Sequence, residues 1–220
     1  MSTTRVAVFD LDGTITRTDT YVDFLLYCLR RKPARLICLP ALAAYLAIHK
    51  AGFKSNHWLK ARYLGAVAGG MTRAQLDEIC KPFIERTMQR NIKQPALNEL
   101  SRLRSEGFTL VLATASFGFY VRSLAEALGF DEVLCTEAQF DKHDELTGVL
   151  DGKNCIGDEK ARQIQLLAAE KGWGAIELGY SDSKVDLPML DMVGQALVID
   201  PKAATEKIAG EKGYKVLRWR

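Results

Sequence analysis

The chain has 220 residues, of which 48% are hydrophobic and 26% are charged, a balance typical of a folded protein rather than a disordered one. This length allows one α/β core with a small accessory domain, and the net charge of +3 is too small to indicate nucleic-acid binding. The five cysteines form no CxxC pair and no zinc-ligand spacing, and no secretory signal precedes the first strand, so we expect free thiols and a cytoplasmic location.

Short apolar runs alternate with helical segments over most of the chain. The runs that predict buried strands are 5–9, 108–113, 132–135, 175–178 and 196–199, with an edge strand at 215–219. The helical segments between them are 96–105, 120–128, 159–171 and 202–210. Strands that alternate with helices of this length predict the α/β class, with a doubly wound, Rossmann-like parallel sheet.

Two segments interrupt the alternation. Between residues 14 and 94 the pattern is helical only, over 21–31, 36–50, 56–66 and 73–89, and Thr72 with Gln75 forms a capping box for the last helix. We therefore predict a helical cap domain of residues 15–94, inserted into a core domain of residues 1–14 and 95–220. The second interruption, 139–156, contains a short stretch at 146–150 that predicts a hairpin strand.

The first strand ends in Asp10-Leu-Asp-Gly-Thr14. Ligands bind at the carboxyl ends of strands in open parallel sheets, so both carboxylates can face one site. Such a pair can hold a hard cation, or can divide the roles of nucleophile and general acid. The alternative is a turn whose aspartates are simply solvated.

Polar residues also follow the later strands. Thr114 and Ser116 place hydroxyls and backbone N–H groups before a helix, where a phosphate can bind. Lys160 lies early in a predicted helix, and Asp182 and Asp186 lie four residues apart after another strand. Taken one at a time, these residues have ordinary explanations. The threonine can be a helix cap, Lys160 can be a solvated side chain, and Asp182 and Asp186 can be an acidic helix start.

Together, in this order, the four motifs resemble those of the haloacid dehalogenase superfamily of phosphohydrolases over nearly the whole chain. The resemblance implies that Asp10 is the nucleophile and that Asp12 is the general acid and then the base. It implies that the phosphoryl group is bound by Thr114, Ala115 and Lys160. It also implies a Mg²⁺ cofactor held by Asp10, the backbone carbonyl of Asp12 and Asp182, with Asp186 supporting that shell.

The same resemblance has a physical logic. A cation and a lysine neutralise the repulsion between a carboxylate nucleophile and a phosphate dianion. Attack by Asp10 would give an aspartyl-phosphate intermediate. Because Asp12 must arrive protonated, we expect its acidic neighbours to raise its pKa.

The helical insertion resembles the cap of the phosphoserine-phosphatase-like branch. That branch often reads Gly-Asp-Gly-x-Asn-Asp in its last motif, whereas this chain reads Ser181-Asp-Ser-Lys-Val-Asp186. Val185 replaces the Asn, so one outer polar contact is missing or is supplied by Ser183. An intact Asp12 favours ester hydrolysis over dehalogenation, which has no use for that acid.

The substrate is less well defined. The apolar run 36–48 is too short to cross a membrane, and basic residues flank it: Arg30, Arg31, Lys32, Arg35, His49, Lys50 and Lys54. It is either a buried cap helix or an interfacial helix that contacts an anionic membrane peripherally, at its inner face. The cap also resembles that of phosphatidylglycerophosphatase C enzymes, which implies a phospholipid headgroup phosphate as substrate.

Two alternatives remain open. The first is a soluble metabolite phosphatase acting on phosphoserine or histidinol phosphate. Asp19 would help to set that specificity, because in phosphoserine phosphatase an acidic residue nine positions after the nucleophile helps to bind the substrate amine. The second is a non-catalytic module of the same fold that binds a phosphate ligand.

Overall fold

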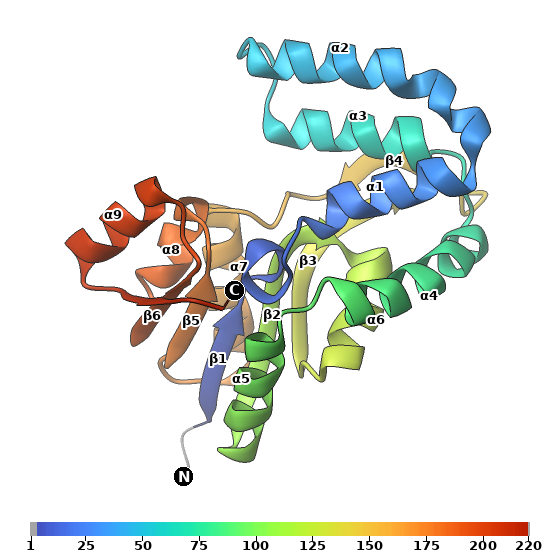
Figure 1. The fold of residues 1–220 in the computed structure, drawn as a ribbon. Coiled ribbons are helices and arrows are strands. Elements are labelled where there is room, and N and C mark those ends of the chain that lie inside the picture. The colour runs from blue at the N-terminus through green and yellow to red at the C-terminus, as the bar shows by residue number, and fades with distance from the viewer. Residues whose placement is uncertain (1–3, 220) are drawn as a thin grey trace.

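Seven strands form one sheet in the order β4-β3-β2-β1-β5-β6-β7 in a computed structural model that describes residues 4–219 (Figure 1). The strands are β1 Arg5–Phe9, β2 Phe108–Phe117, β3 Glu132–Phe140, β4 Leu146–Asp151, β5 Leu178–Ser181, β6 Gln195–Ile199 and β7 Lys215–Leu217. All neighbours are parallel except β3 and β4, which form the antiparallel hairpin predicted at 146–150. The predicted Rossmann-like α/β fold class is confirmed.

One predicted strand was displaced. The run 175–178 was expected to form a strand, but β5 begins only at Leu178. The two residues before it make only a few backbone bonds ahead of the regular ladder, which begins at Leu178: Glu177 N–H donates to Val6 O at 3.0 Å, Glu177 O accepts from Gln195 N–H at 2.8 Å, and Ile176 O accepts from Gly194 N–H at 2.9 Å. Ile176 is nevertheless buried, so the apolar residue at this position indicates burial and not membership of a strand.

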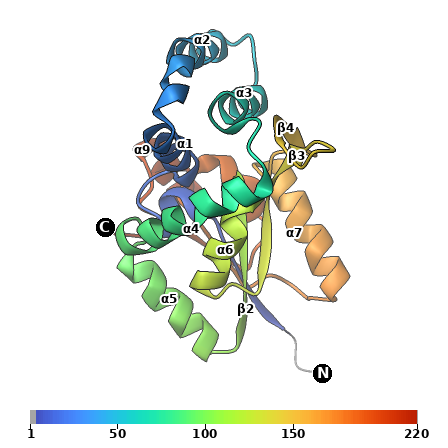
Figure 2. The same ribbon diagram turned by 90° about the vertical axis from the view of Figure 1, so that its right-hand side faces the viewer.

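Helices cover both faces of the sheet, as Figures 1 and 2 show. The core helices are α5 Gln94–Ser105, α6 Gly118–Leu128, α7 Asp158–Lys171, α8 Leu187–Leu190 and α9 Ala203–Lys212. Successive side chains of β1 point to opposite faces: Ala7 and Phe9 join one buried cluster, while Val6 and Val8 join the other. A strand buried on both sides explains why β1 is a continuous apolar run.

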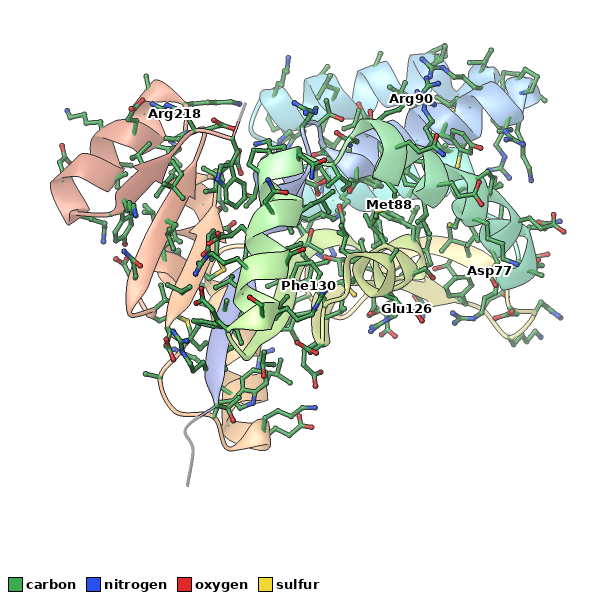
Figure 3. All side chains as sticks on the ribbon, turned by 60° about the horizontal axis from the view of Figure 1, so that its bottom comes forward. Asp77, Met88, Arg90, Glu126, Phe130 and Arg218 are labelled. Carbon is green, nitrogen blue, oxygen red and sulfur yellow. The ribbon has the colours of Figure 1, made fainter. Side chains whose placement is uncertain are left out.

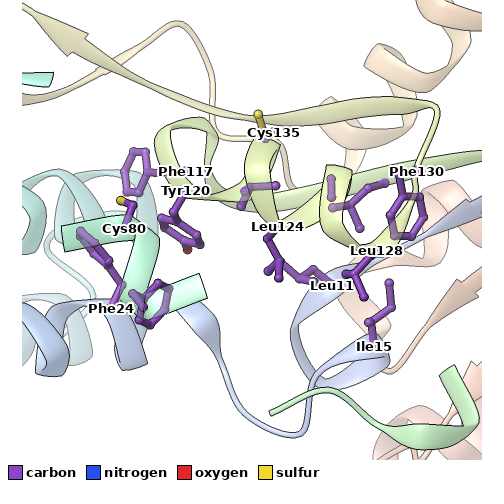
Figure 4. Close-up of a cluster of buried hydrophobic side chains, with 14 of the residues drawn as sticks. Leu11, Ile15, Phe24, Cys80, Phe117, Tyr120, Leu124, Leu128, Phe130 and Cys135 are labelled. Atoms are coloured by element: carbon purple, nitrogen blue, oxygen red, sulfur yellow. The ribbon is translucent and has the colours of Figure 1, made fainter. Parts of the chain in front are cut away.

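The larger cluster extends from the core into the helices that follow β1. Figure 4 shows Leu124 and Leu128 of α6 near Leu11 and Ile15, and Phe24 near Tyr120. The rings of Phe24 and Tyr120 stack with centroids 5.3 Å apart. Shared apolar packing therefore fixes the start of the insertion against the core.

The insertion is helical, as predicted. It comprises α1 Thr20–Arg31, a 3-10 helix Pro33–Cys38, α2 Leu39–Lys50, α3 Asn56–Ala68 and α4 Arg73–Arg90. We call these elements the cap; α2 is its outermost layer in both ribbon views. The capping box of Thr72 and Gln75 is present, whereas the single helix predicted over 36–50 is divided after Cys38. The domain boundaries at 14/15 and 94/95 stay a prediction.

The cap touches the core at a second place, the hairpin of β3 and β4. Gly70 N–H donates to Leu146 O, and Leu146 N–H donates to Met71 O, both at 2.8 Å. Gly148 lies so close to α3 that a Cβ there would come within 2.3 Å of the Gly65 Cα. The cap is thus bound both by its two chain connections and by this hairpin.

In the described part of the chain, residues 4–219, no helix is long and apolar enough to span a membrane.

Candidate active site

The site begins where β1 ends. Asp10 N–H donates to Tyr180 O at 2.9 Å, which ties the end of β1 to β5. The chain then turns through residues 11–15, where Gly13 has φ +83°, a left-handed conformation that suits glycine. A Cβ on Gly13 would lie 2.5 Å from Asp182 Oδ2. The turn therefore brings the first and last motifs together, and only glycine leaves room for both.

Lys160 joins Asp10 and Asp186 in a buried cluster. Its Nζ lies 2.7 Å from Asp10 Oδ1 and 2.8 Å from Asp186, and its side chain is only 2% exposed. Burial alone would lower the pKa of Lys160, but the two carboxylates more than offset this and raise it above its ordinary value. Lys160 is therefore a fixed cation beside the predicted nucleophile.

The carboxyl group of Asp10 is held on both oxygens. Oδ1 faces Lys160, while Oδ2 accepts a hydrogen bond from Thr14 Oγ1 at 3.1 Å. Burial raises the pKa of Asp10 to about 8, against the opposing effect of Lys160. Asp186 is also held, since Ser181 Oγ donates to its Oδ2 at 2.7 Å.

Asp12 is held separately, by two donors that point at its two oxygens. Thr20 N–H donates to Oδ1 and Ser116 Oγ donates to Oδ2, both at 2.7 Å. Its pKa is raised, as predicted, but burial is the first cause and Asp19 only the second. The predicted cause was therefore incomplete, because the buried position of this carboxyl group cannot be read from its acidic neighbours.

Asp182 is linked to Asp10 through one hydroxyl. Asp182 N–H donates to Thr14 Oγ1 at 3.0 Å, and Thr14 in turn donates to Asp10. Burial, followed by the charge of Asp186, raises the pKa of Asp182 to about 6. No side chain of residues 4–219 donates a hydrogen bond to the Asp182 carboxylate, so its oxygens are free to bind a cation.

The donor set fits a hard cation. Within residues 4–219 no three His, Cys, Asp or Glu side chains form a metal-binding group. The predicted set needs only two carboxylates, from Asp10 and Asp182, together with a backbone carbonyl from Asp12. Three oxygens of this kind, with water, are the ligands that Mg²⁺ takes.

The end of β2 lies beside Asp12. Thr114 is fully buried, and its Oγ1 accepts from Ser116 N–H at 3.0 Å, so it shapes the turn that presents Ser116. Ala115 O accepts a hydrogen bond from Lys60 Nζ. The structure thus brings Ser116 to Asp12, whereas the phosphate-binding roles of Thr114, Ala115 and Lys160 stay predictions.

Lys60 is a site residue that sequence reasoning missed. It belongs to α3 of the cap but is buried, and its Nζ also donates to Asn154 Oδ1 at 3.3 Å. Burial lowers its pKa to about 8, although Asp12 and Asp19 oppose the shift. The spacing of the sequence indicates that Lys60 is buried, because it lies four residues before Leu64 and seven before Val67, on the apolar face of α3.

Beside Asp12 lies a cavity of about 500 Å³ between core and cap. Its polar end contains Asp12, Asp19, Lys60, Ser116 and Asn154. Asp19 also caps α1, because its side chain accepts from Val22 N–H at 2.9 Å. The remaining wall is mainly aliphatic and comes from the cap, with Leu25, Leu29, Leu39, Leu42, Leu46 and Leu59.

The fold and the site define a hydrolase of the α/β class, with a carboxylate-centred site under a helical cap. The chain belongs to the haloacid dehalogenase-like hydrolases, whose family model matches residues 7–191.

Several known proteins are similar to this chain. Protein CicA of Caulobacter vibrioides is 28% identical over 217 residues, which cover 97% of this chain and 86% of CicA. A histidinol-phosphatase of Neisseria meningitidis is 26% identical, over 98% of this chain and 99% of its own. Among solved structures, a Bordetella pertussis protein of unknown function has a TM-score of 0.85 at 22% identity, covering 98% of this chain and 99% of that one.

A substrate-bound phosphoserine phosphatase has a TM-score of 0.69 at 14% identity, covering 99% of this chain and 94% of that one. At such identities the structural likeness shows the fold alone. The family match and the histidinol-phosphatase relative confirm the predicted family and the expectation of a phosphatase, and the fold is that of the predicted phosphoserine-phosphatase-like branch.

Proposed function

We propose that this protein is a Mg²⁺-dependent phosphomonoester hydrolase whose substrate is a lipid with a terminal headgroup phosphate. The observation that carries the proposal is the aliphatic cavity beside Asp12. The leaving group of a phosphate ester must lie next to the general acid, and here that space is lined mainly by leucines. An apolar leaving group gains about 25 cal/mol for each Å² of surface that it buries there.

The chemistry follows from Asp10 and Asp12, whose carboxyl groups are both fixed by hydrogen bonds. An oxygen of Asp10 attacks phosphorus, the ester P–O bond breaks, and Asp12 gives its proton to the leaving oxygen. Asp12, now ionised, takes a proton from water as that water attacks the aspartyl-phosphate. Inorganic phosphate leaves, and both carboxyl groups return to their starting states.

Mg²⁺ would be held by Asp10, the Asp12 carbonyl and Asp182, and would supply positive charge to offset phosphate repulsion. Lys160 supplies a second, permanent positive charge beside Asp10. Ser116 orients the acidic group of Asp12 toward the cavity side of the site.

The cap surface supports peripheral contact with an anionic membrane. Of the large apolar side chains that are exposed in residues 4–219, most belong to the cap: Val22, Leu26, Leu36, Ile37, Leu39, Leu46, Ile48 and Phe53. Ile37 is 88% exposed and Phe53 is 77% exposed. Leu39 and Leu46 also line the cavity, so the exposed apolar surface continues toward the site.

Exposed basic residues flank this apolar segment in the sequence, namely Arg31, Lys50 and Lys54. Apolar side chains with a basic rim are typical of interfacial helices, and each cation near an anionic surface contributes about 1 kcal/mol. Arg35 is an exception among the predicted basic flanks, because it donates to Val67 O at 2.9 Å and Gly69 O at 2.8 Å. Its role is to hold the 3-10 helix on α3.

A second candidate substrate is a soluble metabolite such as histidinol phosphate or phosphoserine. Two observations favour it: the charged side chains of Asp19 and Lys60 at the polar end of the cavity, and the full-length similarity to a histidinol-phosphatase. An amino alcohol or amino acid would place its charged groups against these two residues.

The deciding experiment compares turnover of a lipid phosphomonoester in mixed micelles with turnover of histidinol phosphate, phosphoserine and p-nitrophenyl phosphate, with and without Mg²⁺. We expect Mg²⁺-dependent turnover and the highest kcat/KM on the lipid. Highest kcat/KM on a soluble metabolite would refute the lipid proposal, and no turnover of any substrate would indicate a non-catalytic phosphate-binding module.

Two variants test the cap. Leu42→Gln changes the cavity wall, and Leu166→Gln makes the same change at an exposed leucine of α7. We expect Leu42→Gln to reduce the ratio of lipid to p-nitrophenyl phosphate turnover, and Leu166→Gln to leave it unchanged. Ile37→Glu with Phe53→Glu should weaken binding to anionic vesicles, and equal binding by wild type and this variant would exclude the membrane contact.

A further inference from the structure

A second pocket, of about 260 Å³, lies between α1 and α4 and contains four arginines: Arg17, Arg30, Arg86 and Arg90. The spacing of the residues along α1 and α4 places three of these arginines on the helix faces that line the pocket. Asp23, Leu26 and Arg30 share one face of α1, and Phe83, Arg86, Thr87 and Arg90 share one face of α4. Figure 3 labels Arg90 at the end of α4.

These four guanidinium groups differ from every other arginine of residues 4–219. The others each have a carboxylate, carbonyl or hydroxyl partner, or a contact with an aromatic ring; they are Arg5, Arg31, Arg35, Arg62, Arg73, Arg102, Arg104, Arg122, Arg162 and Arg218. The side chains of the four pocket arginines have no such partner within the described residues. The four arginines without such a partner thus all line the same pocket.

The pocket has one acidic residue, Asp23, and its carboxylate is already engaged. Its Oδ2 accepts from Thr18 Oγ1 at 2.6 Å and from Asn91 Nδ2 at 3.3 Å, and it forms no ion pair with an arginine within residues 4–219. Four positive charges against one negative charge leave the pocket with an excess of three. All four arginines are exposed, so water and salt screen part of their mutual repulsion, and a bound anion would offset the rest.

We propose that this pocket binds a phosphate-bearing anion at a site separate from the active site. Guanidinium groups bind phosphate with two parallel hydrogen bonds, and arginines from two helices and a loop can surround a tetrahedral anion. The shared chemistry is the phosphate group. Its source is either free phosphate in solution or the headgroup of an anionic lipid, and the experiment separates these two sources.

The position of the pocket gives such binding a consequence. Asn91 Oδ1 accepts from the backbone N–H groups of Arg17 at 3.0 Å and Thr18 at 2.9 Å, so the two chain connections between cap and core meet at the pocket. Leu26 of α1 lines both this pocket and the active-site cavity. An anion held by both connections and both helices would fix the cap relative to the core.

The test titrates the full chain with inorganic phosphate and follows the backbone amide resonances of Arg17, Thr18 and Asn91 by NMR. A second arm measures co-sedimentation with phosphatidylcholine vesicles that do or do not contain phosphatidic acid. Both arms use wild type, Arg86→Gln with Arg90→Gln, and a control that removes the same charge from paired arginines, Arg102→Gln with Arg162→Gln. Arg30→Gln is an independent variant on α1.

We expect saturable amide shifts whose midpoint moves about a hundredfold in Arg86→Gln with Arg90→Gln, because each lost charge-assisted contact costs about tenfold in affinity. The control should match wild type. If inorganic phosphate causes no amide shifts, but binding to vesicles with phosphatidic acid falls in the same variant and in Arg30→Gln, the ligand is a lipid headgroup. If neither arm responds, or if the variants respond as wild type does, the proposal is wrong.

Discussion

The pairing of Lys160 with two buried carboxylates predicts a pH-dependent loss of stability in Lys160→Met. Methionine keeps most of the side-chain volume but removes the cation that lies 2.7 Å from Asp10 and 2.8 Å from Asp186. Breaking a buried ion pair on one side costs about 3–5 kcal/mol, because the partner charge stays buried without compensation. We expect a loss of this size in the free energy of unfolding at pH 10, well above the pKa of about 8 that Asp10 has in the folded wild type.

The loss should be smaller at pH 5. Without Lys160 the folded-state pKa of Asp10, already raised to about 8, rises further above its unfolded value near 3.8. A carboxyl group whose pKa is raised by folding binds its proton more tightly in the folded state, so its stabilising effect is present at low pH and disappears as pH rises toward the folded pKa. Protonation of Asp10 at pH 5 thus removes much of the uncompensated charge.

Urea unfolding at pH 5 and pH 10, in the presence of a chelator, measures both values. Lys171→Met serves as the control, since Lys171 pairs with Glu132 at the surface, where ion pairs contribute about 0–1 kcal/mol. A loss below about 1 kcal/mol at pH 10, or the same loss at both pH values, would show that Lys160 does not compensate these carboxylates.

Three further substitutions have defined outcomes. Asp10→Asn should abolish turnover while keeping the folded structure, and activity above a few per cent of wild type would rule out Asp10 as the nucleophile. Asp182→Ala should raise the Mg²⁺ concentration needed for half-maximal activity, whereas the exposed Asp77→Ala should leave it unchanged; identical Mg²⁺ dependence in both would contradict the cation site. Gly13→Ala should lower activity and stability by more than Gly107→Ala, because both residues have positive φ but only Gly13 has atoms, those of Asp182, within 4 Å of the new Cβ. Equal effects, judged by unfolding and turnover, would mean that only backbone strain matters.

The sheet and the carboxylate positions were predictable because they depend on local signals. Apolar runs mark strands buried on two faces, and residues after a strand in a parallel sheet share one edge, so Asp10 and Asp182 could be placed together. The antiparallel β4 was predicted in the same way, from a short apolar stretch between polar turns. β5 was displaced because Ile176 is buried without being part of a strand ladder.

Contacts between the cap and the core were not predictable in this way. Helical periodicity indicates which face of α3 is buried, but it does not say that Lys60 reaches Ala115, which is fifty-five residues further along the chain. Arg35 was grouped with the other basic flanks because charge alone does not show that its donors are occupied by carbonyl groups. The arginine pocket depends on the packing of α1 against α4, which no local pattern specifies.

The hairpin contact also determines how the cap can move. A rotation of the cap that keeps both of these attachments can turn only about the line that joins them, here from the chain connections near Asn91 to the backbone bonds at Leu146, and it must release the contact of Lys60 with Ala115. Elements near that axis, such as the ends of α4, sweep a short arc, whereas α2 lies furthest out and sweeps the longest one (Figure 1). The leucines of α2 would therefore separate from the cavity first, so a substrate could enter sideways beneath α2 while Asp12 and its donor Ser116, which belongs to β2 of the core, stay in place.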